Sequence, residues 1–380
     1  MNELTLGTLD ESYADVIDPE EVDFQDIERP WNPDDIRVTT RSFSLRNMLD
    51  AIEEEGLDLA PDFQRLRVWK AVQKAQLIES ILLQIPLPAF YFAEDQDGTL
   101  RVVDGVQRLS TIYDYCRGGS DGRGGFALSG LEYVGDVTGM RFKDLPALWQ
   151  RRIHNTQIIA HVIDPTTPTP VMYDIFRRIN TGGTPLNGQE IRHCISRERS
   201  RTFLKRLAET EDFTLATGGL LRNQRRMIDR EVALRFVAFW LQGPERFNTT
   251  MDEFLWTATE ALDDPRRVSD AELLDIEARF LKGLRSAVDI FGPHAYRKWP
   301  EGDERLLPFN RALFDSWTVE LARIDQSLDS STQSTIRTEA RAMMRDDDEY
   351  LASITASTGD RRRVETRFLT ARSIISRALS

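Results

Sequence analysis

The sequence has few cysteines and no long apolar run, and these two absences limit the class of protein. No stretch of its 380 residues approaches the roughly 18 consecutive apolar residues that a membrane-spanning helix needs. The first residues, Met1–Leu4, have neither the basic start nor the apolar core of a signal peptide. Cys116 and Cys194 cannot form a disulfide framework and suit a reducing compartment. We therefore expect a cytoplasmic protein without a membrane partner.

Histidines and catalytic glycine motifs are also scarce. His154, His161, His193 and His294 do not combine with the cysteines at metal-ligand spacing. The sequence contains neither a Walker-type glycine loop followed by Lys-Ser/Thr nor a Gly-x-Ser-x-Gly elbow. It also lacks a His-Asn-His-like nuclease core. These absences argue against a histidine-based hydrolase and against nuclease activity of the chain's own.

Charge is abundant but unevenly distributed. Charged residues make up 29% of the chain and hydrophobic residues 41%, as in soluble globular proteins. Much of the net charge of −13 comes from residues 1–28, which hold ten acidic residues and no lysine or arginine. We expect residues 1–30 to be a disordered, solvated acidic tail. An alternative, which the sequence leaves open, is that this tail folds over a basic groove and competes with a polyanion.

One stretch in the first third of the chain combines a strand, a tight turn and a helix. Residues 99–103 alternate and are rich in β-branched side chains, which is typical of a strand. Beyond this strand, apolar residues recur at helical spacing until the glycine pair at 118–119. We therefore predict a strand-to-helix turn at Asp104–Arg108.

This turn carries groups suited to binding an anion. A strand-to-helix turn directs backbone N–H groups and the positive end of the helix dipole at one point. Gln107 and Arg108 add side-chain donors, and an arginine can bind a phosphate through two parallel hydrogen bonds. The alternative is a surface turn at which Asp104 caps the helix. The residues alone leave both interpretations open.

Two further segments offer donors to such an anion. Pro61 interrupts regular structure, so we expect a loop that presents Arg65 and Arg67 just before an amphipathic helix, either as plain surface charges or as a second phosphate or base contact. Within residues 177–192, a helix ends at a glycine pair, and Asn187 with Glu190 predicts a capping box for the next helix. This corner is either a capped connection and nothing more, or a place where backbone approaches a ligand closely. In the second case the ligand would lie beside Asn180, Gly182, Gly183 and Arg192.

The remaining patterns predict the other elements of the fold. We expect strands at 36–40, 89–93, 100–103 and 157–164, with a hairpin joining the second and third. Helices are expected between Ser44 and Gly56, over Lys70–Gln84 and from Thr169. The helix at 70–84 should bury one stripe of apolar side chains: Val72, Ala75, Ile78, Leu82 and Ile85.

From about Ser200 the pattern is almost entirely helical. Examples are 228–241, 251–262, 270–291 and 306–324. The fold class is therefore α+β, in three parts. These are the acidic tail at 1–30, an α+β domain with a small mixed sheet at 31–198, and a helical domain at 199–380.

Three motifs, taken together and in order, resemble the N-terminal domain of the GmrSD-type restriction endonucleases, a ParB/sulfiredoxin-like nucleotide-binding domain. The resemblance extends over roughly residues 36–240. The motifs are Phe63-Gln64-Arg65-x-x-Val68-Trp69 with its helix to Pro88, Val103-Asp104-Gly105-Val106-Gln107-Arg108-Leu109, and Ile179-Asn180-Thr181-Gly182-Gly183-Thr184-Pro185-Leu186-Asn187-x-Gln189-Glu190-Ile191-Arg192.

The resemblance implies a fold and a function. Relatives bind and often hydrolyse nucleoside triphosphates and act in defence against phage or foreign DNA. Their nuclease usually lies in a separate C-terminal domain of the His-Asn-His class, which this sequence does not show. We expect a nucleoside-triphosphate-binding and hydrolysing component of a bacterial restriction-type system, stand-alone in form. It would need a separate nuclease or defence subunit to cut DNA, and it could contact DNA itself or form oligomers.

The resemblance also suggests roles for residues. Asp104, Gln107 and Arg108 would be catalytic, with Asp104 holding a Mg²⁺ ion or positioning a water molecule. The family's central motif is usually Asp-Gly-Gln-Gln-Arg, whereas this chain has Val106 at the third place. The nucleotide would be bound by residues from all three motifs: Arg65, Gly105, Arg108, Asn180, Gly182, Gly183 and Arg192.

Two alternatives to an NTPase remain. The first is a non-catalytic, nucleotide-gated DNA-binding or adaptor protein. The second is a thiol-based, sulfiredoxin-like activity. The second is disfavoured because no cysteine lies within 104–108, and Cys116 follows about two helical turns later.

Overall fold

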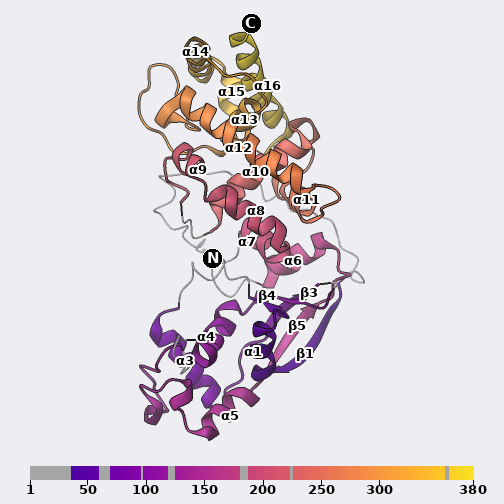
Figure 1. Ribbon diagram of the computed structural model, residues 1–380, viewed down its shortest axis with the longest axis vertical. Helices are drawn as coiled ribbons and strands as arrows, with labels where there is room; N and C mark the ends of the chain where they lie inside the picture. The colour runs from indigo at the N-terminus through magenta and orange to yellow at the C-terminus, as the bar shows by residue number, and fades with distance from the viewer. Residues whose placement is uncertain are drawn as a thin grey trace, which may run out of the picture. The chain divides into compact units, whose positions relative to one another are not determined.

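The computed structural model contains one five-stranded sheet and many helices, which confirms the predicted α+β class (Figure 1). The described residues divide into two compact units, one ending at Ile195 and the other beginning at Ser196. No helix among them is long and apolar enough to cross a membrane. The structure describes residues 36–59, 69–95, 97–118, 125–179, 187–222, 226–355 and 359–380.

The sheet of the first unit is mixed and has the order β1-β5-β3-β4-β2. β1 pairs with β5 and β3 with β4 in antiparallel fashion, whereas β5/β3 and β4/β2 are parallel pairs. The predicted hairpin is confirmed as β3/β4. The first strand begins and ends later than predicted, and the short β2 was not expected. The strands are β1 (Val38–Ser44), β2 (Leu57–Asp58), β3 (Phe90–Glu94), β4 (Leu100–Asp104) and β5 (Gln157–Ile163).

Helices pack against the face of the sheet into which alternate apolar side chains of the strands point. Phe90 and Phe92 of β3 point into a core that is shared with buried residues of α1, α3, α4 and α5. Ser44 caps α1 as predicted, because its side chain accepts a hydrogen bond from the amide of Asn47. The helices of this unit are α1 (Leu45–Glu53), α3 (Ala71–Leu82), α4 (Val106–Arg117), α5 (Ala147–Asn155), α6 (Thr169–Ile179) and α7 (Gly188–Ile195), with 3-10 turns η2 (Gly135–Val137) and η3 (Phe142–Asp144).

The predicted apolar stripe of α3 is wrong at both ends. Val72 and Ile85 are about half exposed, at 48% and 49%. The helix ends at Leu82 and Gln84 adopts a left-handed conformation, so Ile85 lies beyond the helical face. The buried side is instead formed by Ala75, Leu77, Ile78, Ile81 and Leu82.

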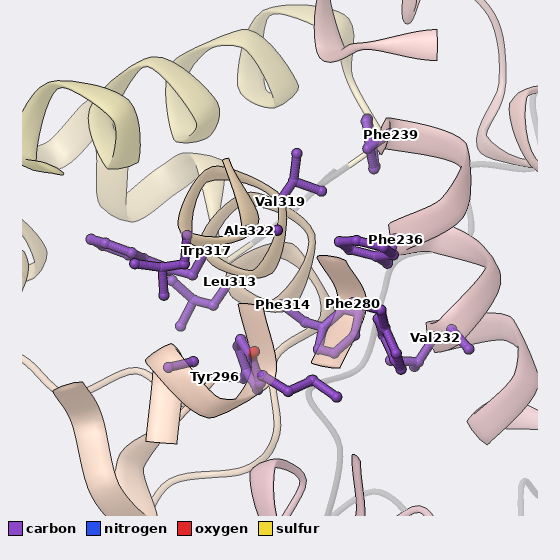
Figure 2. Packing of buried hydrophobic residues seen from close by; sticks show 14 of the residues in the cluster. Val232, Phe236, Phe239, Phe280, Tyr296, Leu313, Phe314, Trp317, Val319 and Ala322 are labelled. Carbon is purple, nitrogen blue, oxygen red and sulfur yellow. The ribbon is translucent and has the colours of Figure 1, made fainter. Parts of the chain in front are cut away.

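The second unit is helical and has its own aromatic core (Figure 2). Phe236 and Phe280 have ring centroids 5.0 Å apart, and Phe314 packs against Phe280. The predicted helices at 228–241, 251–262 and 270–291 are confirmed, whereas the one predicted from 306 begins only at Arg311, after its N-cap Asn310.

Helices make up most of this unit, with longer connections between α9 and α10 and between α12 and α13. They are α8 (Glu198–Ala208), α9 (Glu211–Ala216), α10 (Ile228–Gln242), α11 (Met251–Asp263), α12 (Asp270–Phe291), α13 (Arg311–Ala322), α14 (Ser330–Asp346), α15 (Asp348–Ser353) and α16 (Arg361–Ala378), with 3-10 turns η5 (Pro244–Arg246) and η6 (Gly292–His294).

A charged cluster is enclosed in this second core. Arg235 donates two hydrogen bonds to Asp315, from Nε to Oδ1 at 2.9 Å and from a terminal nitrogen to Oδ2 at 2.7 Å. Arg367 donates a third to Oδ2 at 3.0 Å. The side chains of all three residues have no exposed surface. A carboxylate from α13 therefore joins α10 to α16 inside the apolar core.

Candidate functional site

The predicted strand-to-helix turn is present at the end of β4. The strand ends at Asp104, and α4 begins at Val106. Between them Gly105 has φ +97°, in the left-handed region that favours glycine. A Cβ atom at Gly105 would lie 2.3 Å from Cδ1 of Phe90. Glycine therefore allows the turn both its conformation and its close contact with β3.

Arg108 fixes this turn through several contacts. One terminal nitrogen donates to Oδ2 of Asp104 at 2.9 Å and to the carbonyl of Ala89 at 3.2 Å. The other donates to the carbonyl of Pro88. The guanidinium also lies 4.2 Å from the centroid of the Phe90 ring. Burial lowers the pKa of Arg108, and the neighbouring Asp104 carboxylate opposes that shift. The side chain still carries its positive charge, as arginines in proteins do.

These contacts define what the turn offers to a ligand. The Asp104 side chain is 39% exposed, and Arg108 occupies only one of its two oxygens. Arg108 donates three of the five N–H groups of its guanidinium to Asp104, Ala89 and Pro88, so most of its donors hold the turn together. The geometry therefore favours a positioning role for Arg108, which holds a half-exposed carboxylate in place.

The interpretation in which Asp104 caps the helix is wrong. The N-cap of α4 is Gly105, which has no side chain and leaves the first-turn N–H groups without a capping acceptor from that residue. Val106 is buried in the core of the unit, whereas Gln107 is half-buried and has interaction partners within the chain. The turn thus has the helix N-terminus and the carboxylate that the sequence predicted, with a different cap.

The segment predicted within residues 177–192 contacts β4 through α7. The capping box is confirmed, since the Asn187 amide donates to Glu190 at 2.7 Å and the Glu190 amide donates to Asn187 Oδ1 at 2.8 Å. Arg101 of β4 donates to the carbonyl of Ile195, at the end of α7. Arg192 is 1% exposed, and its Nε donates to Gln189 at 3.0 Å.

Four of the predicted binding residues cannot be placed. Arg65, Asn180, Gly182 and Gly183 lie outside the described residues, so their position relative to Asp104 stays a prediction.

The match with known proteins covers this same part of the chain. Residues 45–196 match the family model of the GmrSD restriction endonuclease N-terminal domain. This segment is a GmrSD N-terminal domain. No curated protein and no solved structure matches the chain. The GmrSD domain associates the protein with a restriction or defence system, and it contains both the turn and α7.

The GmrSD domain also carries side chains at this site that sequence reasoning missed. Tyr91 of β3 lies opposite Asp104 in the β3/β4 ladder, and the register shifts next to it, between Tyr91 and Phe92. On its other side Tyr91 lies opposite His161 of β5, with ring centroids 4.9 Å apart. The alternation of both strands predicts that these side chains face away from the core. The pairing of β3 with β5 is not visible in the sequence.

Thiol chemistry receives no support from the GmrSD domain. Burial raises the pKa of the Cys116 thiol to about 12, so the reactive thiolate is scarce at neutral pH. Cys194 on α7 is also buried. Among the described residues, no three His, Cys, Asp or Glu side chains converge in a way that could hold a metal ion by themselves.

Proposed function

We propose that the GmrSD domain binds a nucleoside triphosphate at the β4–α4 turn and hydrolyses it with Mg²⁺, as the nucleotide-dependent component of a restriction-type defence system. One observation carries the proposal. The half-exposed Asp104 carboxylate, held by Arg108, stands at the N-terminus of a twelve-residue helix. A helix N-terminus favours the phosphates, and a carboxylate beside it favours their counter-ion.

The residues at the turn fit a magnesium ion. Mg²⁺ in nucleotide sites is usually bound by one or two carboxylates together with phosphate oxygens and water, so a full protein cage is not needed. Asp104 would supply the carboxylate, through the oxygen that Arg108 does not occupy. The bound ion would offset the negative charge of the phosphates.

The chain's own residues would divide the remaining tasks. Arg108 would hold Asp104 in its orientation, and Gln107 would orient the phosphates or the attacking water. Arg192, buried against Gln189, would hold α7 in place. The remaining phosphate contacts are proposed for Arg65, Asn180, Gly182 and Gly183.

We further propose that DNA cleavage depends on a separate nuclease subunit. The support for this is the missing His-Asn-His core and the scarcity of histidine in the sequence. Nucleotide turnover in the GmrSD domain would then regulate that partner or its access to DNA.

Substituting the carboxylate tests this function directly. Binding and phosphate release are measured with each of the four NTPs, with and without Mg²⁺, on wild type, Asp104→Asn and Asp136→Asn. Asp136 is an exposed carboxylate on η2 of the same unit and serves as the matched control. We expect Mg²⁺ to strengthen binding and support hydrolysis in wild type and in Asp136→Asn, but not in Asp104→Asn.

The positioning role of Arg108 is tested in the same assay. Loss of a group that orients a metal-binding side chain typically costs about 10–100-fold in affinity or activity, which we expect for Arg108→Ala. Equal Mg²⁺ dependence in wild type and Asp104→Asn would refute the assignment. Mg²⁺-dependent binding without phosphate release would replace hydrolysis by the nucleotide-gated adaptor alternative.

A further inference from the structure

A row of polar and aromatic side chains crosses the sheet and ends at the proposed nucleotide site. Thr40, His161 and Tyr91 lie opposite one another on β1, β5 and β3, and Tyr91 pairs with Asp104 of β4 beside the register shift between Tyr91 and Phe92. The side chains of the first three are in contact. Thr40 Oγ1 is 3.1 Å from His161 Nδ1, and the His161 ring lies against that of Tyr91. These three side chains therefore lie on one face of the sheet, next to the end of β4 that carries Asp104.

This face is open where the row crosses it. Phe90 and Phe92 alternate with Tyr91 and point into the core, so Tyr91 and His161 project from the opposite side. Both are half-buried, and Thr40 is exposed. Ile159, two residues from His161 and on the same face, is 53% exposed. The aromatic pair is therefore accessible from solvent.

The spacing of the row matches a nucleotide. Neighbouring strands lie about 4.8 Å apart, so β4 and β5 are separated by roughly 10 Å across β3. A nucleoside triphosphate with its phosphates at Asp104 would extend over a similar distance. Its base would then reach the pair formed by Tyr91 and His161.

We propose that Tyr91 and His161 form a platform on which the base of the bound nucleotide stacks. This inference rests on the proposed function, because the platform is assigned to the nucleotide bound at Asp104. Aromatic rings stack on any base through its π-face, so the platform binds all four bases. The contact between Thr40 and Nδ1 holds the imidazole ring in place.

The alternative is that the pair only stabilises the sheet. Cross-strand aromatic pairs do contribute to sheet stability, by about 0.2–1 kcal/mol. Such a role would leave nucleotide binding unaffected by the loss of either ring. A test therefore has to separate binding of the base from binding of the phosphates.

The experiment compares a nucleoside triphosphate with inorganic triphosphate. Affinities of the full chain for ATP, GTP, CTP, UTP and tripolyphosphate are measured by calorimetry in the presence of Mg²⁺. The variants are Tyr91→Ala, Tyr91→Phe and His161→Ala, with Tyr133→Ala as the control for removal of an exposed phenol ring in the same unit. Thermal unfolding of each variant confirms that it is folded.

We expect Tyr91→Ala and His161→Ala to bind NTPs about 5-fold to 140-fold more weakly than wild type, which is the range for loss of one stacking ring. Their affinity for tripolyphosphate should be unchanged. Tyr91→Phe, which keeps the ring, and Tyr133→Ala should bind like wild type.

Two results would overturn the platform while leaving the proposed function intact. One is that wild type binds NTPs and tripolyphosphate equally well. The other is that folded Tyr91→Ala and His161→Ala bind NTPs like wild type. A wild-type protein that binds neither NTPs nor tripolyphosphate would overturn the proposed function and the platform together.

Discussion

The buried cluster of Arg235, Asp315 and Arg367 gives the largest stability effect that we predict. Replacing Asp315 by asparagine removes the one negative charge that all three hydrogen bonds use, and leaves two guanidinium groups facing a neutral amide. Each charge-assisted bond is worth about 1.5–3 kcal/mol, but losses within one cluster are not additive. Breaking a buried ion pair from one side typically costs about 3–5 kcal/mol, and we expect Asp315→Asn to fall in that range.

The measurement is thermal and urea unfolding of the full chain. In a unit of this size, 1 kcal/mol corresponds to about 2–4 °C in Tm, so the expected loss is about 6–20 °C for the transition of the second unit. Asp325→Asn is the matched control. Its carboxylate is 82% exposed and pairs with Arg279 and Lys282, and an exposed pair of this kind contributes about 0–1 kcal/mol.

A triple variant separates the charge from the shape of the cluster. Replacing Arg235 and Arg367 by methionine and Asp315 by leucine removes all three charges together. Apolar replacement of a buried ion cluster is often neutral or stabilising, so this variant should be more stable than Asp315→Asn. If Asp315→Asn unfolds within 1 kcal/mol of Asp325→Asn, on the scale of an exposed pair, the cluster does not hold the core together and our reasoning is refuted.

Two further predictions concern the first unit. Gly98 and Gly105 both have positive φ, but only at Gly105 would a Cβ atom lie against Phe90. Gly98→Ala should therefore lower the free energy of unfolding by about 1–2 kcal/mol, and Gly105→Ala should lower it by about 1–3 kcal/mol more. Equal losses in urea unfolding would show that the contact with Phe90 is unimportant. Burial tends to raise the pKa of Glu79, but the backbone N–H groups of 132–134 outweigh burial and lower it below 4.5. The stabilisation by the Glu79 carboxylate is therefore complete above about pH 4.5, and it is lost as the pH falls through the lower pKa that Glu79 has in the folded protein. When Tm is measured from pH 7 to pH 3, Glu79→Gln should be less stable than wild type at pH 7 and should lose less stability than wild type as the pH falls. Parallel pH profiles of Tm for the two proteins would contradict this.

Local signals predicted much of the fold because they depend on neighbours in sequence. The N-cap at Ser44, the hairpin before β4 and the capping box at Asn187 all involve groups within a few residues of one another. The prediction that α3 buries Val72 and Ile85 was wrong, because the length of a helix and the side that it buries depend on the sheet against which it packs.

The site was predictable only in part for the same reason. Asp104 and the helix after it could be found from alternation and helical spacing. The hydrogen bonds from Arg108 to the carbonyls of Pro88 and Ala89 could not be predicted, because they depend on how the end of β4 packs beside the start of β3. The sheet order that brings His161 to Tyr91 requires a parallel pairing between strands that are more than sixty residues apart.

The structure also explains why valine is accepted at the third place of the central motif. Val106 follows the glycine cap, is 7% exposed, and packs in the apolar core of the first unit. A side chain at this place points away from the surface that carries Asp104, so exchanging an amide for valine alters packing and removes no group from that surface. An unpartnered amide buried there would cost about 1–3 kcal/mol, which valine avoids. The departure from the family motif is therefore compatible with the binding turn that we propose, in which Asp104 and the groups that position it would support turnover.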